Sequence, residues 1–192
     1  EWKLLTALLF HTGLRIGEAN GLRWKNVDFV NHRLHIVEQY SRPTKKLTTV
    51  KTETSKRTLP MNADVETILN KQWDAIFTMS KNAPRTRQGK SLWVNNDLVF
   101  PNEIGSIFIQ QSYIRALTQA SRNAELPRLT PHDLRHTCAS QLIKEKINIK
   151  VISKWLGHKD VATTWNTYIH LFDDDIEQPS QALAKAYSGM LV

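Results

Sequence analysis

The chain has 192 residues, about the size of one ordinary domain and enough to bury a hydrophobic core. Its 26 Lys and Arg residues outnumber 18 Asp and Glu residues, and the formal charge of +8 favours a polyanionic partner such as nucleic acid. The single cysteine, Cys138, excludes a disulfide framework and a cysteine-based metal site, and favours a reducing, intracellular setting.

The first predicted element is an apolar helix over residues 2–10. This segment is far shorter than a membrane span and has no signal-peptide cleavage site, so we expect a core helix and no membrane partner. Gly13 can take the left-handed conformation that ends a helix. A second helix is predicted to begin near Arg15 and to run through Glu18 and Leu22.

Three short segments predict a small antiparallel β-sheet. They are rich in β-branched and alternating residues and cover 34–39, 49–52 and 57–60. The turns between them carry most of the local positive charge. A basic stretch over 81–90, which contains no acidic residue, is predicted to be a surface loop.

The rest of the chain is predicted to be helical. Capping residues and apolar spacing indicate a helix that begins at Asn62 or Asp64, followed by helices over 108–124, 131–144, 149–156 and 161–168. We therefore expect an α+β fold, a mainly helical domain with a small antiparallel β-sheet.

The two ends of the chain suggest its domain organisation. The chain starts at Glu1 without an initiator methionine, which indicates a fragment of a longer protein. Residues 171–192 change character, with acidic residues at 173–175 followed by an alanine-rich segment. We interpret 1–192 as one domain with a C-terminal tail over 171–192, and the acidic cluster as a solvated linker rather than a metal site.

Basic residues at two predicted helix starts suggest an anion site. His132 and Arg135 are three residues apart, so they lie on one face near the start of the 131–144 helix, the end that favours anions. Arg15 follows a glycine-containing turn, and Glu18 lies one helical turn further on. An arginine fork suits two phosphate oxygens, although a plain surface ion pair between Arg15 and Glu18 is the commoner arrangement.

Four segments in a fixed order identify a family. They are Thr-Gly-Leu-Arg-Ile-Gly-Glu at 12–18, His-Asp-Leu-Arg-His-Thr at 132–137, Leu-Gly-His at 156–158 and Thr-Tyr-Ile-His at 167–170. Together they resemble the tyrosine recombinase (phage integrase) family over nearly the whole chain. The resemblance implies the tyrosine recombinase catalytic fold and a DNA strand transferase that uses neither a metal ion nor another cofactor.

The resemblance also implies a role for each matching residue. Arg15 and Arg135 correspond to the arginines that clamp the scissile phosphate. His132 and His158 correspond to residues that contact the phosphate and assist proton movement. Tyr168 corresponds to the nucleophile, which forms a covalent 3′-phosphotyrosyl intermediate before the strands are rejoined.

The family places a catalytic lysine on a β-hairpin, where it protonates the departing 5′-oxygen. Lys51 matches this position best, Lys56 is the rival, and Lys45 and Lys46 match less well.

Two further residues are expected to support the site. Glu18 would orient Arg15, and Asp133 would orient the helix that carries the histidines. His136 is expected to pack behind the site in a structural role.

The expected partner is double-stranded DNA, bound mainly through phosphates. The candidate contacts lie on the hairpin turns and the 81–90 loop: Arg42, Lys45, Lys46, Lys56, Arg57, Arg85 and Arg87. By resemblance, the protein is expected to be a mobile-element integrase, cytoplasmic, bacterial and DNA-associated. We expect it to act as a homotetramer on DNA with accessory directionality proteins, and residues 181–192 to dock on a neighbouring subunit.

Two alternatives share parts of this pattern. A type IB topoisomerase uses the same tyrosine chemistry but relaxes supercoils without exchanging strands. A catalytically inactive DNA-binding module would retain the fold alone, although every matched position keeps its chemical type.

Overall fold

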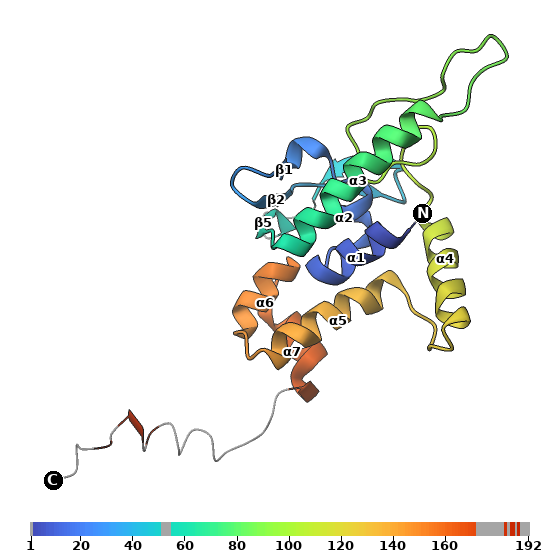
Figure 1. Ribbon diagram of the computed structural model, residues 1–192. Coiled ribbons are helices and arrows are strands. Elements are labelled where there is room, and N and C mark those ends of the chain that lie inside the picture. Colours follow the sequence, from blue (N-terminus) through green and yellow to red (C-terminus); the bar gives the residue numbers. More distant parts are fainter. Residues whose placement is uncertain (1, 51–54, 172–182, 184, 187, 189–192) are drawn as a thin grey trace.

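The computed structural model describes residues 2–50, 55–171, 183, 185, 186 and 188 (Figure 1). Its helices are α1 (Lys3–Thr12), α2 (Ile16–Asn20), α3 (Ala63–Lys81), α4 (Gln110–Asn123), α5 (Pro131–Lys144), α6 (Ile149–Leu156) and α7 (Val161–Tyr168), with 3-10 turns η1 (Trp24–Asn26) and η3 (Ile169–Leu171). The strands are β1 (Val27–Asp28), β2 (Arg33–Ile36), β3 (Glu38–Ser41), β4 (Lys46–Thr49) and β5 (Arg57–Pro60). The mainly helical α+β class expected from the sequence is confirmed.

The strands form two small antiparallel sheets, whereas the sequence predicted one. The first has the order β1-β2-β5, and the second pairs β3 with β4. The predicted strand over 34–39 is interrupted at Val37, so that β2 and β3 belong to different sheets. In the first sheet Leu34 lies opposite Leu59, and both side chains are buried in the core.

Helix α1 is the centre of the core. It lies between α3 and α5, and packs against both (Figure 1). Leu5, Leu8 and Leu9 recur at helical spacing on one face, and each is at most 1% exposed. Burial of such a side chain contributes roughly 2 kcal/mol. This packing fixes the turn that follows α1 relative to α5.

Two glycines near Arg15 determine how the chain turns. Gly13 ends α1 in the left-handed conformation, with φ of 66°, and its N–H donates to the carbonyl of Leu9. Helix α2 ends at Asn20, earlier than predicted, because the chain at Gly21 packs against β3. A Cβ at Gly21 would lie 2.8 Å from the Gln39 backbone. Helix α2, which begins directly after Arg15, is therefore held against β3.

A second apolar cluster joins α5, α6 and α7. Ala139 and Ile143 of α5 pack with Ile152 and Leu156 of α6 and with Tyr168 of α7. The cluster fixes the end of α6 and the end of α7 against α5.

Along the described chain, no helix combines the length and hydrophobicity that a membrane crossing requires.

Candidate active site

Arg135 connects two turns from the middle of the structure. It projects from α5, is only 3% exposed, and its Nη1 and Nη2 donate to the carbonyls of Gly13 and Leu156, each at 2.6 Å. Burial, followed by the charge of Arg15, lowers the pKa of Arg135 to about 10. The guanidinium is still a cation at neutral pH, so the site contains a buried positive charge.

Arg15 reaches the same turn from the other side. It precedes α2, and its guanidinium donates to the carbonyl of Gly157 from Nη1 at 3.4 Å and from Nη2 at 3.3 Å. Arg15 and Arg135 thus bind the carbonyls of two consecutive residues, Leu156 and Gly157. Unlike Arg135, the Arg15 side chain is 41% exposed, so it can meet a ligand from solvent.

Glu18 is 1% exposed and forms ion pairs with Arg15 and with Arg57 of β5. Its Oε1 accepts from Arg15 Nη1 at 3.1 Å, and its Oε2 accepts from Arg57 Nη2 at 2.8 Å. Burial alone would raise the pKa of Glu18, but the hydrogen bond and charge of Arg57, followed by those of Arg15, outweigh it and hold this pKa below its ordinary value. Glu18 is therefore an anion that fixes both guanidinium groups.

The structure corrects the expectation that Arg57 lies on an exposed hairpin turn, because it is the first residue of β5 and its side chain is buried. Its side chain is 6% exposed and donates to Glu18 from Nη1 and Nη2, and to the carbonyl of Trp155 from Nε at 2.7 Å. A Cβ at Gly157 would lie 2.8 Å from Arg57 Nη1, so the guanidinium packs directly on the turn after α6. Through these contacts Arg57 connects β5 to the turn after α6.

His158 follows Gly157 and faces the same cationic groups. Its Nδ1 is 2.7 Å from Oγ1 of Thr164, a buried residue of α7. Burial, followed by the charges of Arg135, Arg15 and Arg57 and by His132, lowers the pKa of His158 to about 4. The imidazole is therefore neutral at pH 7, and an anion bound nearby would favour its protonation.

Tyr168, the last residue of α7, is 4% exposed. Its Oη is 2.7 Å from Nδ1 of His136 on α5, and the His136 ring in turn contacts the His132 ring edge-on, with centroids 4.4 Å apart. Burial raises the pKa of Tyr168, although Arg135 opposes this rise. His136 therefore contacts Tyr168 directly. The sequence did not predict this contact, because no residue near Tyr168 in the sequence indicates which histidine its side chain will contact.

Asp133 acts at the start of α5. Its Oδ2 accepts from the N–H and the Oγ1 of Thr130, both at 2.7 Å, and Thr130 Oγ1 accepts from the Asp133 N–H at 3.3 Å. This reciprocal capping, with Pro131 at the first helical position, fixes the first turn that carries His132. The hydrogen bond from Thr130 lowers the pKa of Asp133, so the cap is charged.

A basic cavity of about 460 Å³ opens beside His158. Of its lysines, only Lys56 was selected from the sequence. Lys150 and Lys154 are four residues apart on the predicted 149–156 helix, and this spacing, which places both on one face, could have indicated a basic surface. The lining of the cavity combines β5 with α6 and the turn after it: Lys56, Arg57, Lys150, Ser153, Lys154, His158, Lys159 and Val161.

The remaining predicted DNA contacts lie in separate places. Arg42, Lys45 and Lys46 are exposed on or next to the β3–β4 hairpin. Arg85 and Arg87 are exposed in the loop beyond the end of α3 that is remote from α6 and α7 (Figure 1). The structure does not bring this loop to the candidate site. Lys51, the predicted catalytic lysine, and nearly all of the tail over 171–192 lie outside the described residues.

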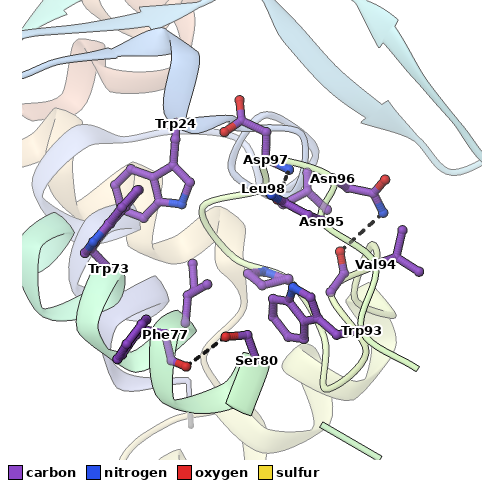
Figure 2. A pocket seen from close by; sticks show the side chains of 13 residues that line it. Trp24, Trp73, Phe77, Ser80, Trp93, Val94, Asn95, Asn96, Asp97 and Leu98 are labelled. Carbon is purple, nitrogen blue, oxygen red and sulfur yellow. Dashed lines mark hydrogen bonds between the residues drawn. The ribbon is translucent and has the colours of Figure 1, made fainter. Parts of the chain in front are cut away.

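An aromatic pocket of about 230 Å³ occupies another part of the molecule (Figure 2). Trp24 and Trp73 meet edge-to-face there, with ring centroids 4.9 Å apart, and Phe77 and Trp93 line the same space. None of the residues selected from the sequence lines it.

The fold is shared with solved recombinases. It superposes on the integrase of transposon Tn1549 in complex with circular intermediate DNA, with a TM-score of 0.75 at 24% identity, over 95% of this chain and 60% of that chain. For XerA recombinase the TM-score is 0.65 at 23% identity, over 98% of this chain and 57% of that chain. The architecture is therefore that of a tyrosine recombinase catalytic domain.

The chain belongs to the phage integrase family, which it matches over residues 1–175. It is 30% identical over 182 residues to the integrase of Staphylococcus phage L54a, covering 90% of this chain and 49% of that protein. It is 28% identical over 185 residues to a XerC-like tyrosine recombinase of Caldanaerobacter subterraneus subsp. tengcongensis, covering 88% of this chain and 45% of that protein. The chain thus spans about half the length of these relatives.

Proposed function

We propose that this chain is the catalytic domain of a site-specific DNA recombinase or integrase, which cleaves and rejoins DNA through Tyr168. The observation that carries the proposal is the position of Arg15 and Arg135 on the carbonyls of Leu156 and Gly157. Two guanidinium groups converge there next to His158. A phosphodiester placed at this turn would meet both.

The arginines would stabilise the negative charge that develops on the equatorial oxygens of the phosphorus. An opposite charge at about 4 Å contributes roughly 4 kcal/mol at an effective dielectric constant near 20. Arg15 is the exposed partner and would contact the incoming phosphate first, whereas Arg135 is preorganised by its two short hydrogen bonds. On this basis we also propose that the reaction needs no metal ion.

His132 and His158 would contact the phosphate oxygens and move protons. His158 is neutral in the free protein because burial, followed by the surrounding cations, lowers its pKa to about 4. Bound phosphate would supply the missing anion, raise its pKa and make the imidazole a charged hydrogen-bond donor. Lys51 remains the proposed donor of the proton to the departing 5′-oxygen.

Tyr168 would attack the phosphorus, form the 3′-phosphotyrosyl bond and release the 5′-hydroxyl. An unperturbed phenol costs roughly 4 kcal/mol to ionise at pH 7, and burial raises that cost here. The phenol-phosphate ester conserves the energy of the broken backbone bond. A 5′-hydroxyl of another strand could therefore attack it and seal the DNA without ATP.

The flanking DNA phosphates would lie along the basic cavity beside His158 and on the β3–β4 hairpin. Lys150, Lys154 and Lys159 join the contacts predicted from the sequence. We further propose double-stranded DNA as the substrate, a tetrameric assembly in which residues 181–192 dock on a neighbouring subunit, and accessory proteins that set direction. A mobile element in a bacterial cytoplasm is the proposed setting.

Covalent trapping tests the mechanism. The protein is incubated with nicked duplex DNA in EDTA and run on a denaturing gel beside the Tyr168→Phe variant. A protein–DNA adduct that the variant cannot form is the expected result. Cleavage that survives the substitution and needs a divalent metal would overturn the mechanism.

Strand exchange separates the recombinase from a topoisomerase. The phage integrase match and the recombinase relatives do not favour the topoisomerase alternative. Joining of a labelled strand to a second duplex is expected. Relaxation of supercoils without such joining would contradict the proposal.

A further inference from the structure

The Tyr168 hydroxyl contacts a histidine, His136, that has no role in the mechanism described above. His136 follows Arg135 on α5, and its Nδ1 lies 2.7 Å from Tyr168 Oη, with ring centroids 5.4 Å apart. The family resemblance gave this residue no chemical role, and Tyr168 makes its hydroxyl contact with it rather than with His132 or His158.

Burial and the neighbouring charges determine whether the His136 ring is protonated. From its own helix, His132, Asp133 and Arg135 act on it, and from α7 it faces Tyr168. Burial, followed by His132 and Arg135, lowers the pKa of His136, and Asp133 only partly opposes this. The imidazole is therefore neutral at pH 7. In that state Nδ1 can accept a hydrogen bond from the phenol, with the ring proton on Nε2.

We propose that His136 is the general base that accepts the phenolic proton of Tyr168. The proposal rests on the function proposed above. In cleavage, the Oη–H bond breaks and the Nδ1–H bond forms while Oη attacks the phosphorus and the bond from phosphorus to the 5′-oxygen breaks. The 5′-oxygen takes its proton from water or from a cationic side chain at the site.

Rejoining reverses these transfers. An incoming 5′-hydroxyl attacks the phosphorus and gives its proton to water or to the side chain that protonated the departing oxygen, the bond to Oη breaks, and Oη takes its proton back from Nδ1. A base within hydrogen-bond reach suits a tyrosine whose pKa is raised by burial, because ionisation by water alone would be costly. The same histidine serves as base in one direction and acid in the other.

The test compares His136→Asn with wild type. Asparagine keeps an acceptor at the Nδ1 position but does not accept a proton in this pH range. Adduct formation is timed from about pH 5 to 9.5 on nicked duplexes with randomised flanking sequence. His35→Asn is the matched control, because His35 bonds Thr58 away from the site and is expected to react like wild type.

We expect His136→Asn to slow adduct formation roughly 100- to 10,000-fold at pH 7. Its rate should rise with pH towards the pKa of Tyr168, whereas the wild-type rate should level off above the pKa of His136. A residue that only holds the tyrosine would not change the pH profile. Wild-type rate and profile in the asparagine variant would overturn the proposal.

Nitrogen NMR of wild-type protein keeps the test independent of how the variant folds. The neutral His136 ring is expected to carry its proton on Nε2, and a proton on Nδ1 would overturn the inference.

If Tyr168→Phe abolishes the adduct while His136→Asn reacts normally, only the role of His136 fails. If wild type forms no adduct on DNA that it binds, both proposals fail.

Discussion

Glu18 and Arg57 form an ion pair that is closed to solvent, with Oε2 of Glu18 2.8 Å from Nη2 of Arg57. The two residues are far apart in sequence, and the pair joins α2 to β5. Because Arg57 Nε also donates to Trp155, the same guanidinium holds the end of α6. The buried Arg57 guanidinium therefore holds the turn at Leu156 and Gly157, which Arg15 and Arg135 contact.

Removing Arg57 should destabilise the fold. Arg57→Met leaves Glu18 as a buried anion with only Arg15 to compensate it, and loss of one member of a buried pair costs about 3 kcal/mol. Urea unfolding at pH 7 measures this, with the exposed Lys46→Met as control. An Arg57→Met midpoint equal to that of the control would contradict this account of the pair.

Stability should fall in weak acid because of His158. The folded-state pKa is about 4, below the ordinary value of about 6.5, so the unfolded chain binds the proton more readily between these values. Unfolding free energy should therefore rise with pH across this window. His136, whose pKa is also lowered, contributes with the same sign.

The His158→Asn variant tests this sign. Urea midpoints between about pH 5 and 6.5 should rise less steeply with pH than in wild type, because one of the two contributing histidines is gone. Carboxyl groups with ordinary pKa values of about 4 are largely ionised in this window. An unchanged slope would mean that His158 is not held neutral by its surroundings.

The lysines beside His158 should control the salt dependence of DNA binding. Lys154→Ala and Lys159→Ala should each weaken binding, and each should reduce the slope of log K against log salt by about 0.9. Lys71→Ala, which removes an exposed lysine of α3, is the matched control. If the slope of log K against log salt is the same in all three variants, the lysines of this cavity do not contact DNA phosphates.

The cap of α5 should contribute measurably to stability. Thr130→Ala removes both hydroxyl hydrogen bonds with Asp133 and should cost about 1 kcal/mol. Thr130→Ser keeps the hydroxyl and should lose much less. Thermal and urea unfolding of the two variants measure the difference, and equal losses would show that the hydroxyl is unimportant.

Local signals predicted the helices around the site well. Helices α5, α6 and α7 lie where the sequence placed them, and in the structure each begins at a capping side chain, Thr130, Asn148 or Asp160. These caps bond backbone groups two or three residues away, so neighbouring residues suffice to place them. The turn at Gly157 is equally local, with φ of 67°.

By itself, the sequence determined the family, the mainly helical class and the residues to consider at the site. Only the tertiary structure decided that Arg57 is buried, that the strands form two sheets, and that His136 meets Tyr168. These outcomes depend on side chains that are distant along the chain and meet through packing of α5, α6, α7 and β5. Hydrophobic spacing predicts which face of an element is buried, but not which partner covers it.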